Sequence, residues 1–227
     1  QALCGCNDVA GAVKTVDGLI KLDSGISIEM AGYLETTGNV DLKASNSISS
    51  MPGTTPTVST PLTANITGKL LTAVAGNQIE LRTNVRSADL GLTSPGANNT
   101  IKVWNDGELT LSSVTTNNDA KEIIIESTGR LIASSVGTGR DVDINLTGVG
   151  ITLGSITPGS IRAGSKAVAL DAGTGAITDG NGDSNNVIAH SLTTTSQGGV
   201  GVGNALEVVL SDSFSFTETG AGGIELM

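Results

Sequence analysis

Short alternating segments recur along the chain at a nearly constant spacing, and this repeat constrains the fold more than any other feature. In each segment, two apolar residues flank a single residue. These segments begin at Ile20, Val40, Ile79, Ile101, Ile123, Ile144 and Val168. The steps between their starts are 20, 39, 22, 22, 21 and 24 residues, and we interpret the 39 as two steps. A constant period of this length is typical of solenoids, whose repeats bury their apolar faces only by stacking.

The residues within each repeat predict strands rather than helices. The stretches 103–114 and 125–136 share one pattern, in which apolar and polar residues alternate on both sides of a turn at Gly107 or Gly129. Alternation with a period of two buries one face of a strand. We therefore predict an all-β, right-handed parallel β-helix (a β-solenoid) with coils of about 20–24 residues and almost no α-helix. An antiparallel sandwich is the alternative, although it does not require a fixed period.

Composition and charge exclude several functions. Aromatic residues make up 2% of the chain and Gly accounts for 31 of its 227 residues, which suits small strands and tight turns better than an enzyme core. The net charge of −10 provides no basic face, so we expect no nucleic-acid partner. No run of about 18 apolar residues occurs, so we expect no membrane insertion.

The pattern predicts one solenoid segment over residues 1–227. A Pro-rich insertion at 49–61 is expected to loop out from it, because proline cannot donate a ladder hydrogen bond. Both ends of the sequence look cut, which suggests a longer parent chain. Cys4 and Cys6 are too close in sequence for an unstrained disulfide, and we expect free thiols or a thiol that pairs outside this segment.

The last third of the chain resembles a known class of repeats. Residues 172–180 read AGTGAITDG, and residues 198–206 read GGVGVGNAL. These motifs resemble the repeats of giant bacterial surface proteins of the filamentous-haemagglutinin and autotransporter-adhesin type. The resemblance implies a secreted, elongated β-helix that serves in adhesion, surface coating or fibre formation. The secretion domain of the haemagglutinin family is not present in this sequence, so the resemblance leaves the export route open.

One loop carries oxygen-bearing side chains at every second position, as the start of a calcium loop does. These residues are Asp179, Asn181, Asp183 and Asn185. The sixth position is Ser184 instead of Gly, and the twelfth is His190 instead of Glu. We expect a polar turn here, with a calcium site as the alternative. Calcium is the only cofactor that the sequence suggests.

Two carboxylates represent the enzymatic alternative. The repeat places Glu122 and Asp143 on neighbouring coils, both pointing outward, and glycoside hydrolysis uses two such groups. Sugar-binding β-helix enzymes usually also present aromatic platforms, and this chain has one Trp and one Tyr. We expect solvated surface carboxylates and no catalytic residue.

The remaining motifs carry little chemistry. No nucleophile motif lies near His190, the single histidine, and the partners that a serine triad requires cannot be identified from the sequence. The glycine-rich run 198–203 lacks the Lys-Ser/Thr of a phosphate loop.

The repeat also predicts a column of outward side chains. Arg82, Trp104 and Glu126 follow each other at steps of 22 residues, with Arg82 expected over the Trp104 ring. Glu80 is expected beside Lys102 in the same way. Trp104 and Arg82 are therefore the candidate partner-contact residues.

The sequence as a whole favours a structural or adhesive module of an extracellular or cell-surface protein. We expect it to associate with itself end to end into fibres, or to contact other surface proteins or glycans. A carbohydrate-processing lyase or hydrolase is the alternative function.

Overall fold

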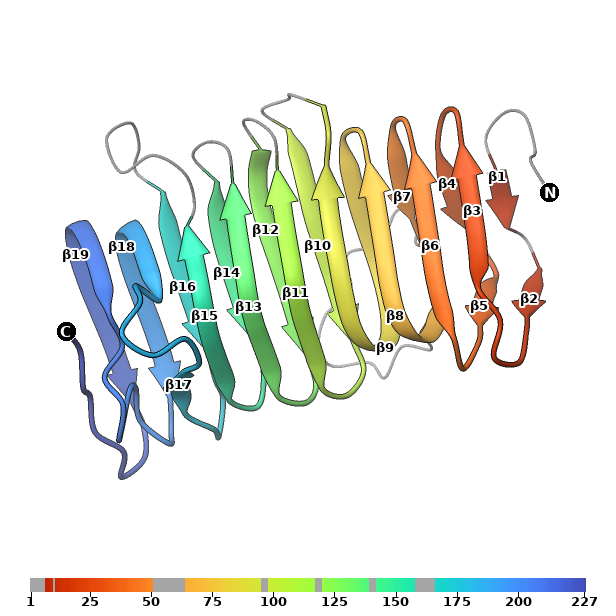
Figure 1. Ribbon diagram of the computed structural model, residues 1–227. Coiled ribbons are helices and arrows are strands. Elements are labelled where there is room, and N and C mark those ends of the chain that lie inside the picture. The colour runs from red at the N-terminus through yellow and green to blue at the C-terminus, as the bar shows by residue number, and fades with distance from the viewer. Residues whose placement is uncertain are drawn as a thin grey trace.

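The computed structural model describes residues 7–9, 11–50, 64–94, 98–116, 120–138, 142–157 and 166–227. Nineteen strands within these ranges form a single sheet, and every strand pairing is parallel. The described residues contain no helix. The predicted parallel β-solenoid is therefore confirmed (Figure 1).

Two long ladders run along the solenoid. The first contains β3 (Ile20–Ser24), β6 (Asn39–Ala44), β8 (Ile66–Ala75), the second half of β9 (Gln78–Leu92), β11 (Leu109–Thr116), β13 (Leu131–Thr138), β15 (Ile151–Thr157) and β17 (Ile177–Asp179). The second contains β1 (Asn7–Val9), β4 (Ile28–Met30), β7 (Ser47–Ser49), the first half of β9, β10 (Asn99–Asn105), β12 (Ala120–Ser127), β14 (Asp143–Thr147), β16 (Ala167–Asp171), β18 (Val187–Ser196) and β19 (Val208–Glu218). The short strands β2 (Ala12–Lys14) and β5 (Tyr33–Glu35) pair with each other beside them, and β5 continues onto the start of β8.

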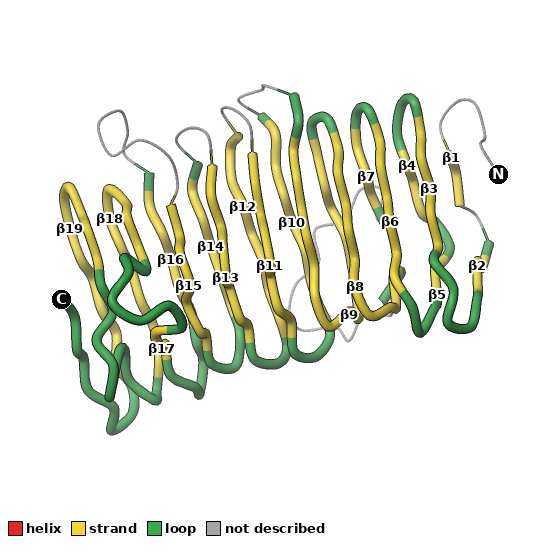
Figure 2. Tube along the Cα trace, viewed as in Figure 1, coloured by secondary structure: helices red, strands yellow, loops and turns green. Residues whose placement is uncertain are grey.

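The path of the chain is right-handed. It rises along the first ladder on the near side of Figure 1, returns along the second ladder behind it, and advances from the N-terminus towards the C-terminus. Figure 2 shows that loops connect the two ladders along both edges of the solenoid.

The register confirms the predicted coil length along most of the second ladder. Ile79 pairs with Ile101, and Ile101 pairs with Ile123, so each of these coils takes 22 residues. One coil is longer, because Ile48 pairs with Ile79 at a step of 31 residues. The added residues belong to the region of the expected insertion at 49–61, of which only Ser49 and Ser50 lie within the described residues.

The interpretation of the 39-residue step as two coils is wrong. Val40 lies on β6 of the first ladder and pairs with Leu71, whereas Ile79 belongs to the second ladder. The step therefore combines a crossing between the ladders with one long coil. Sequence periodicity alone does not distinguish two ladders that carry the same alternation.

The core consists of stacked columns of branched aliphatic side chains. One such column contains Ile48, Ile79, Ile101, Ile123 and Ile144, each with no exposed surface. Full burial of one such side chain contributes roughly 1.5–3 kcal/mol. The outward positions on the same strands carry polar and charged residues, and any functional site must use these.

Candidate functional site

Trp104 lies on the second ladder in the predicted register. It pairs with Arg82 on the preceding coil and with Glu126 on the following coil. These three side chains are half-buried on the outer surface, whereas the neighbouring Val103 is fully buried in the core. The register of the predicted column is therefore confirmed.

The contacts within this column differ from the expected ones. Among the described residues, the cation–π contact is formed by Lys14, whose Nζ lies 5.1 Å from the centre of the Tyr33 ring, and not by Arg82 and Trp104. Arg82 Nε and Trp104 Nε1 are both buried without a hydrogen-bond partner. Burial raises the pKa of Glu126, and the nearby Trp104 indole N–H opposes this by lowering it. The indole thus acts on this carboxylate at a distance or angle outside strict hydrogen-bond geometry.

Lys102 does not form its expected ion pair with Glu80. The two residues are paired in register, but Lys102 Nζ lies 3.0 Å from Glu122 Oε1 on the following coil. Glu80 instead accepts a hydrogen bond from Gln78 Nε2 at 3.2 Å. The diagonal contact is accessible to the long lysine side chain, and register alone does not predict which neighbour it selects.

Glu122 and Asp143 are paired in register, as the repeat predicts, and both are partly exposed. Each forms ion pairs with lysine. Glu122 contacts Lys102 and also Lys121, whose Nζ lies 3.9 Å from Glu122 Oε1, and Asp143 Oδ2 lies 3.7 Å from Lys166 Nζ. This part of the flank is therefore an array of alternating charges.

The loop proposed for calcium is organised around Asp179. The Asp179 carboxylate accepts hydrogen bonds from the backbone N–H groups of Asn181 at 2.8 Å and Gly182 at 3.1 Å. It also accepts them from the side-chain amides of Asn186, at 2.7 Å, and Asn204. Burial raises the pKa of Asp179, but these hydrogen bonds outweigh it and hold the pKa below its usual value. Both carboxylate oxygens are thus already bonded within the protein.

Asn186, which sequence reasoning did not identify, lies at the centre of this loop. Its side chain has no exposed surface, and its Nδ2 donates to Asn181 Oδ1 at 2.6 Å. Its Oδ1 accepts from Glu207 N at 3.0 Å on the next coil. Asp183 and Asn185 are exposed. The described residues contain no group of three or more His, Cys, Asp and Glu side chains that could hold a metal ion. The calcium site stays a prediction.

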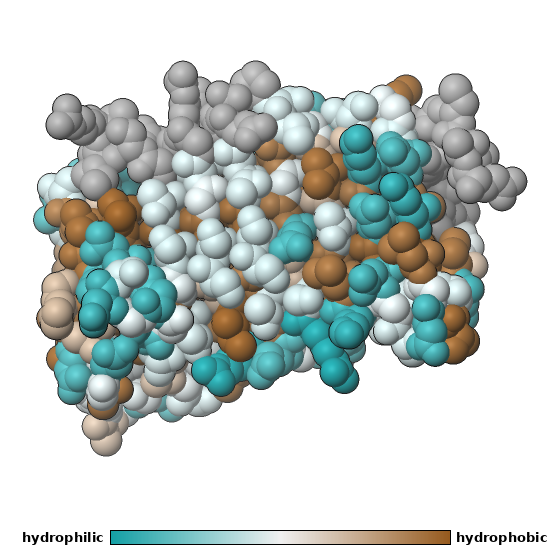
Figure 3. All heavy atoms as spheres, viewed as in Figure 1, coloured by the Kyte–Doolittle hydropathy of each residue, from teal (hydrophilic) through white to brown (hydrophobic). Residues whose placement is uncertain are grey.

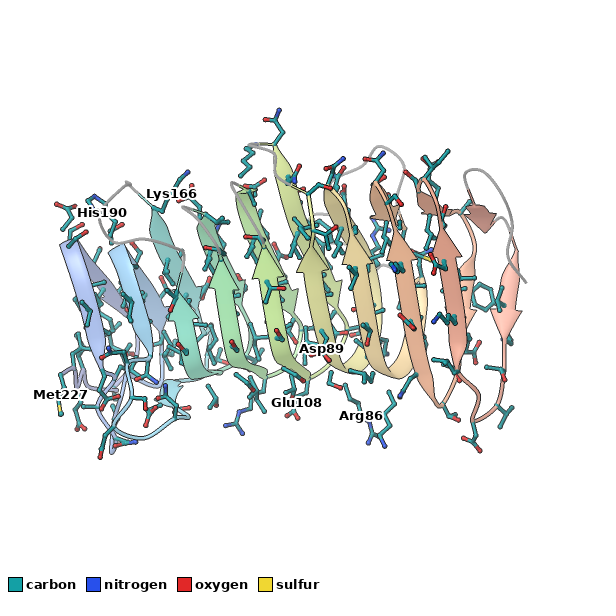
Figure 4. All side chains as sticks on the ribbon, turned by 45° about the horizontal axis from the view of Figure 1, so that its top comes forward. Arg86, Asp89, Glu108, Lys166, His190 and Met227 are labelled. Atoms are coloured by element: carbon teal, nitrogen blue, oxygen red, sulfur yellow. The ribbon has the colours of Figure 1, made fainter. Side chains whose placement is uncertain are left out.

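His190 has partners that the sequence analysis missed. Its Nδ1 lies 2.9 Å from Ser211 Oγ, and its Nε2 lies 3.8 Å from Asp212 Oδ2. The coil period was the signal that could have found them, because Ser211 and Asp212 follow His190 by 21 and 22 residues. Figure 4 shows His190 and Lys166 near the same edge of the solenoid, whereas Arg86, Asp89 and Glu108 lie towards the opposite edge.

These observations define a parallel β-solenoid with ion pairs and polar clusters on its flanks. No family model matches the chain, and no curated protein and no solved structure is significantly similar to it. The described part of the chain contains no helix with the length and apolarity needed to cross a lipid bilayer.

Proposed function

We propose that this chain is a rigid, elongated structural or adhesive module of a secreted or cell-surface protein. The observation that carries this proposal is the near flank of the solenoid, formed by the outward side chains of β11, β13 and β15. Figure 3 shows a broad face of intermediate hydropathy there, with more hydrophilic residues towards both ends. The outward hydroxyls of this flank belong to Thr110, Ser112, Ser113, Thr115, Ser134, Ser135, Thr152, Ser155 and Thr157.

Most of these hydroxyls are free to bind something else. Ser113 pairs with Asp89 on one side, and Ser135 pairs with Ser155 on the other, so the hydroxyls repeat from coil to coil. Strands in a sheet lie about 4.8 Å apart. A rigid array of weak donors and acceptors at this spacing supports multivalent contacts with surface glycans or proteins, in which many weak contacts add to a strong one.

The second part of the proposal is end-to-end association of copies. The inward-facing column of the second ladder passes from Leu192 to Phe214 on β19. Phe214 is 36% exposed and stacks on Phe216, with ring centres 6.4 Å apart. In this chain β19 therefore presents apolar side chains, and an open strand edge is a template for another strand.

An adhesion assay tests the proposed function. Beads coated with the chain should adhere to surfaces coated with glycans or with cell-surface protein. Adhesion should fall at least about tenfold when Ser113, Ser135 and Ser155 are all changed to Lys, because a multivalent array loses every contact at once. The control changes Asn145, Thr193 and Ser215 to Lys, three outward positions of the second ladder. Wild-type beads that adhere to none of these surfaces would contradict the adhesive role.

A carbohydrate-processing enzyme is the alternative function. Its acid and base would be Glu122 and Asp143, which here share their surroundings with three lysines. We expect the purified chain to release no reducing or unsaturated sugar ends from common polysaccharides. Release that is lost in both Glu122→Ala and Asp143→Ala would favour the enzyme instead.

A further inference from the structure

A β-bulge brings three chemically complementary side chains together where β18 meets β19. Ala189 pairs with Leu210 and Ser191 pairs with Ser213, so His190 stands opposite two residues of the neighbouring strand. Successive residues of a regular strand point to opposite faces. The bulge removes this restriction and allows the adjacent residues Ser211 and Asp212 to face His190 together.

The two contacts use opposite nitrogens of the imidazole ring. His190 Nδ1 lies 2.9 Å from Ser211 Oγ, and Nε2 lies 3.8 Å from Asp212 Oδ2. In the tautomer with the proton on Nε2, Nδ1 accepts the Ser211 hydroxyl proton and the Nε2–H points towards the carboxylate. A nucleophile, a base and a group that orients the base are the parts of an activated serine.

We propose that Ser211 is a nucleophilic serine, activated by His190, that reacts with small carboxylic esters. Ser211 Oγ attacks the ester carbonyl carbon while His190 takes the hydroxyl proton. Collapse of the tetrahedral intermediate breaks the bond to the alkoxide, which leaves with the proton from His190. Water then attacks the acyl-serine with His190 again as base, which releases the carboxylic acid and restores Ser211.

The bulge also supplies a donor for the oxyanion of the intermediate. The extra residue of a bulge is left out of the ladder, so its backbone N–H is free at the position of Ser211 and Asp212. The His190 and Asp212 side chains are 33% and 59% exposed. An open site of this kind fits a small ester or an acyl group carried on an extended molecule. This activity goes beyond the proposed structural function and does not depend on it.

The test uses the full chain with two probes, an alkyl fluorophosphonate and p-nitrophenyl acetate. We expect the fluorophosphonate to label Ser211, as located by peptide mass spectrometry, and p-nitrophenyl acetate to be hydrolysed. Both reactions should fall by at least about a hundredfold in Ser211→Ala and His190→Gln, the range expected for loss of general-base catalysis. Ser213→Ala, which removes an exposed hydroxyl two residues away on the same strand, should react like the wild type.

Asp212 is a positioning residue in this proposal, so its variants have a separate readout. Asp212→Asn should slow labelling, and Asp212→Glu should restore it, which a purely structural role does not require. Circular dichroism of each variant checks that the fold is kept. The proposal is overturned if Ser211 is labelled no faster than Ser213, or if His190→Gln is labelled at the wild-type rate.

Discussion

The turn between β10 and β11 depends on one buried amide. Asn105 is 2% exposed, and its Oδ1 accepts hydrogen bonds from Thr83 Oγ1 at 2.8 Å and from Val85 N at 2.9 Å. Its Nδ2 donates to the carbonyl oxygen of Gly107 at 3.2 Å. The side chain thus connects two coils and closes the turn, which places Gly107 in the left-handed region with φ of +96°.

Replacing this amide should measurably destabilise the protein. Asn105→Ala leaves the Thr83 hydroxyl and the Val85 N–H without an acceptor in a buried corner, which costs about 1–3 kcal/mol of unfolding free energy. Urea unfolding at pH 7 measures this change. The matched control is Asn84→Ala, because Asn84 is exposed on β9 and its loss should cost less than about 0.5 kcal/mol. Equal effects of the two substitutions would contradict the role of the buried corner.

Asp179 predicts how stability depends on pH at the acidic end. Its pKa in the folded protein lies below the ordinary value of 3.8, so its ionised form favours the folded state. The stabilisation is fully present above the unfolded pKa and is lost as the pH falls through the folded pKa. The wild type should therefore melt above Asp179→Asn at pH 7, and the gap should narrow only below about pH 4. A gap in melting temperature that does not change between pH 7 and pH 2.5 would argue against these hydrogen bonds.

At the scale of single strands, close stacking of the coils requires glycine at particular positions. Gly154 on β15 is buried, and a Cβ there would collide with the backbone carbonyl of Ser134 on the preceding coil. Gly137 on β13 has open space at the same point. Gly154→Ala should therefore cost about 1–3 kcal/mol through overpacking. Gly137→Ala should be neutral or slightly stabilising, because alanine orders the unfolded chain. Chemical denaturation of both variants checks this, and a neutral Gly154→Ala would mean that the coils are less closely stacked.

The strands and their register could largely be predicted from the sequence, because alternation and period are properties of the chain itself. The column of Arg82, Trp104 and Glu126 follows directly from a period of 22. The choice of Glu122 by Lys102 could not be predicted, since a flexible side chain reaches several neighbours at once.

The site at His190 was missed for a related reason. A local motif search examines neighbours in sequence, whereas the solenoid brings together residues one coil apart. The period places Ser211 and Asp212 near His190, but the bulge that turns both towards it depends on the pairing of β18 with β19. The choice between the two ladders, as at Val40 and Ile79, likewise required the three-dimensional pairing.

At the scale of the whole molecule, the solenoid is a stack in which each coil contacts its neighbours. Its stability is then approximately a sum over coils and interfaces. The ladder extends from β1 to β19, and the net charge of −10 keeps copies apart in solution unless specific contacts oppose it. A module built this way provides length, stiffness and a repeated flank, and these are the properties that the proposed function uses.

The distance along one outward column tests the parallel ladder most directly. Glu80, Lys102, Ile124, Asn145, Ala169, Thr193 and Ser215 pair successively along the second ladder. Spin labels are placed at Ser215 and Ile124, or at Ser215 and Glu80, in a variant with Cys4 and Cys6 changed to Ser. Double electron–electron resonance should then give about 19 Å for four strand spacings and about 29 Å for six. Distances that do not increase with the number of intervening coils, as in an antiparallel sandwich, would contradict the solenoid.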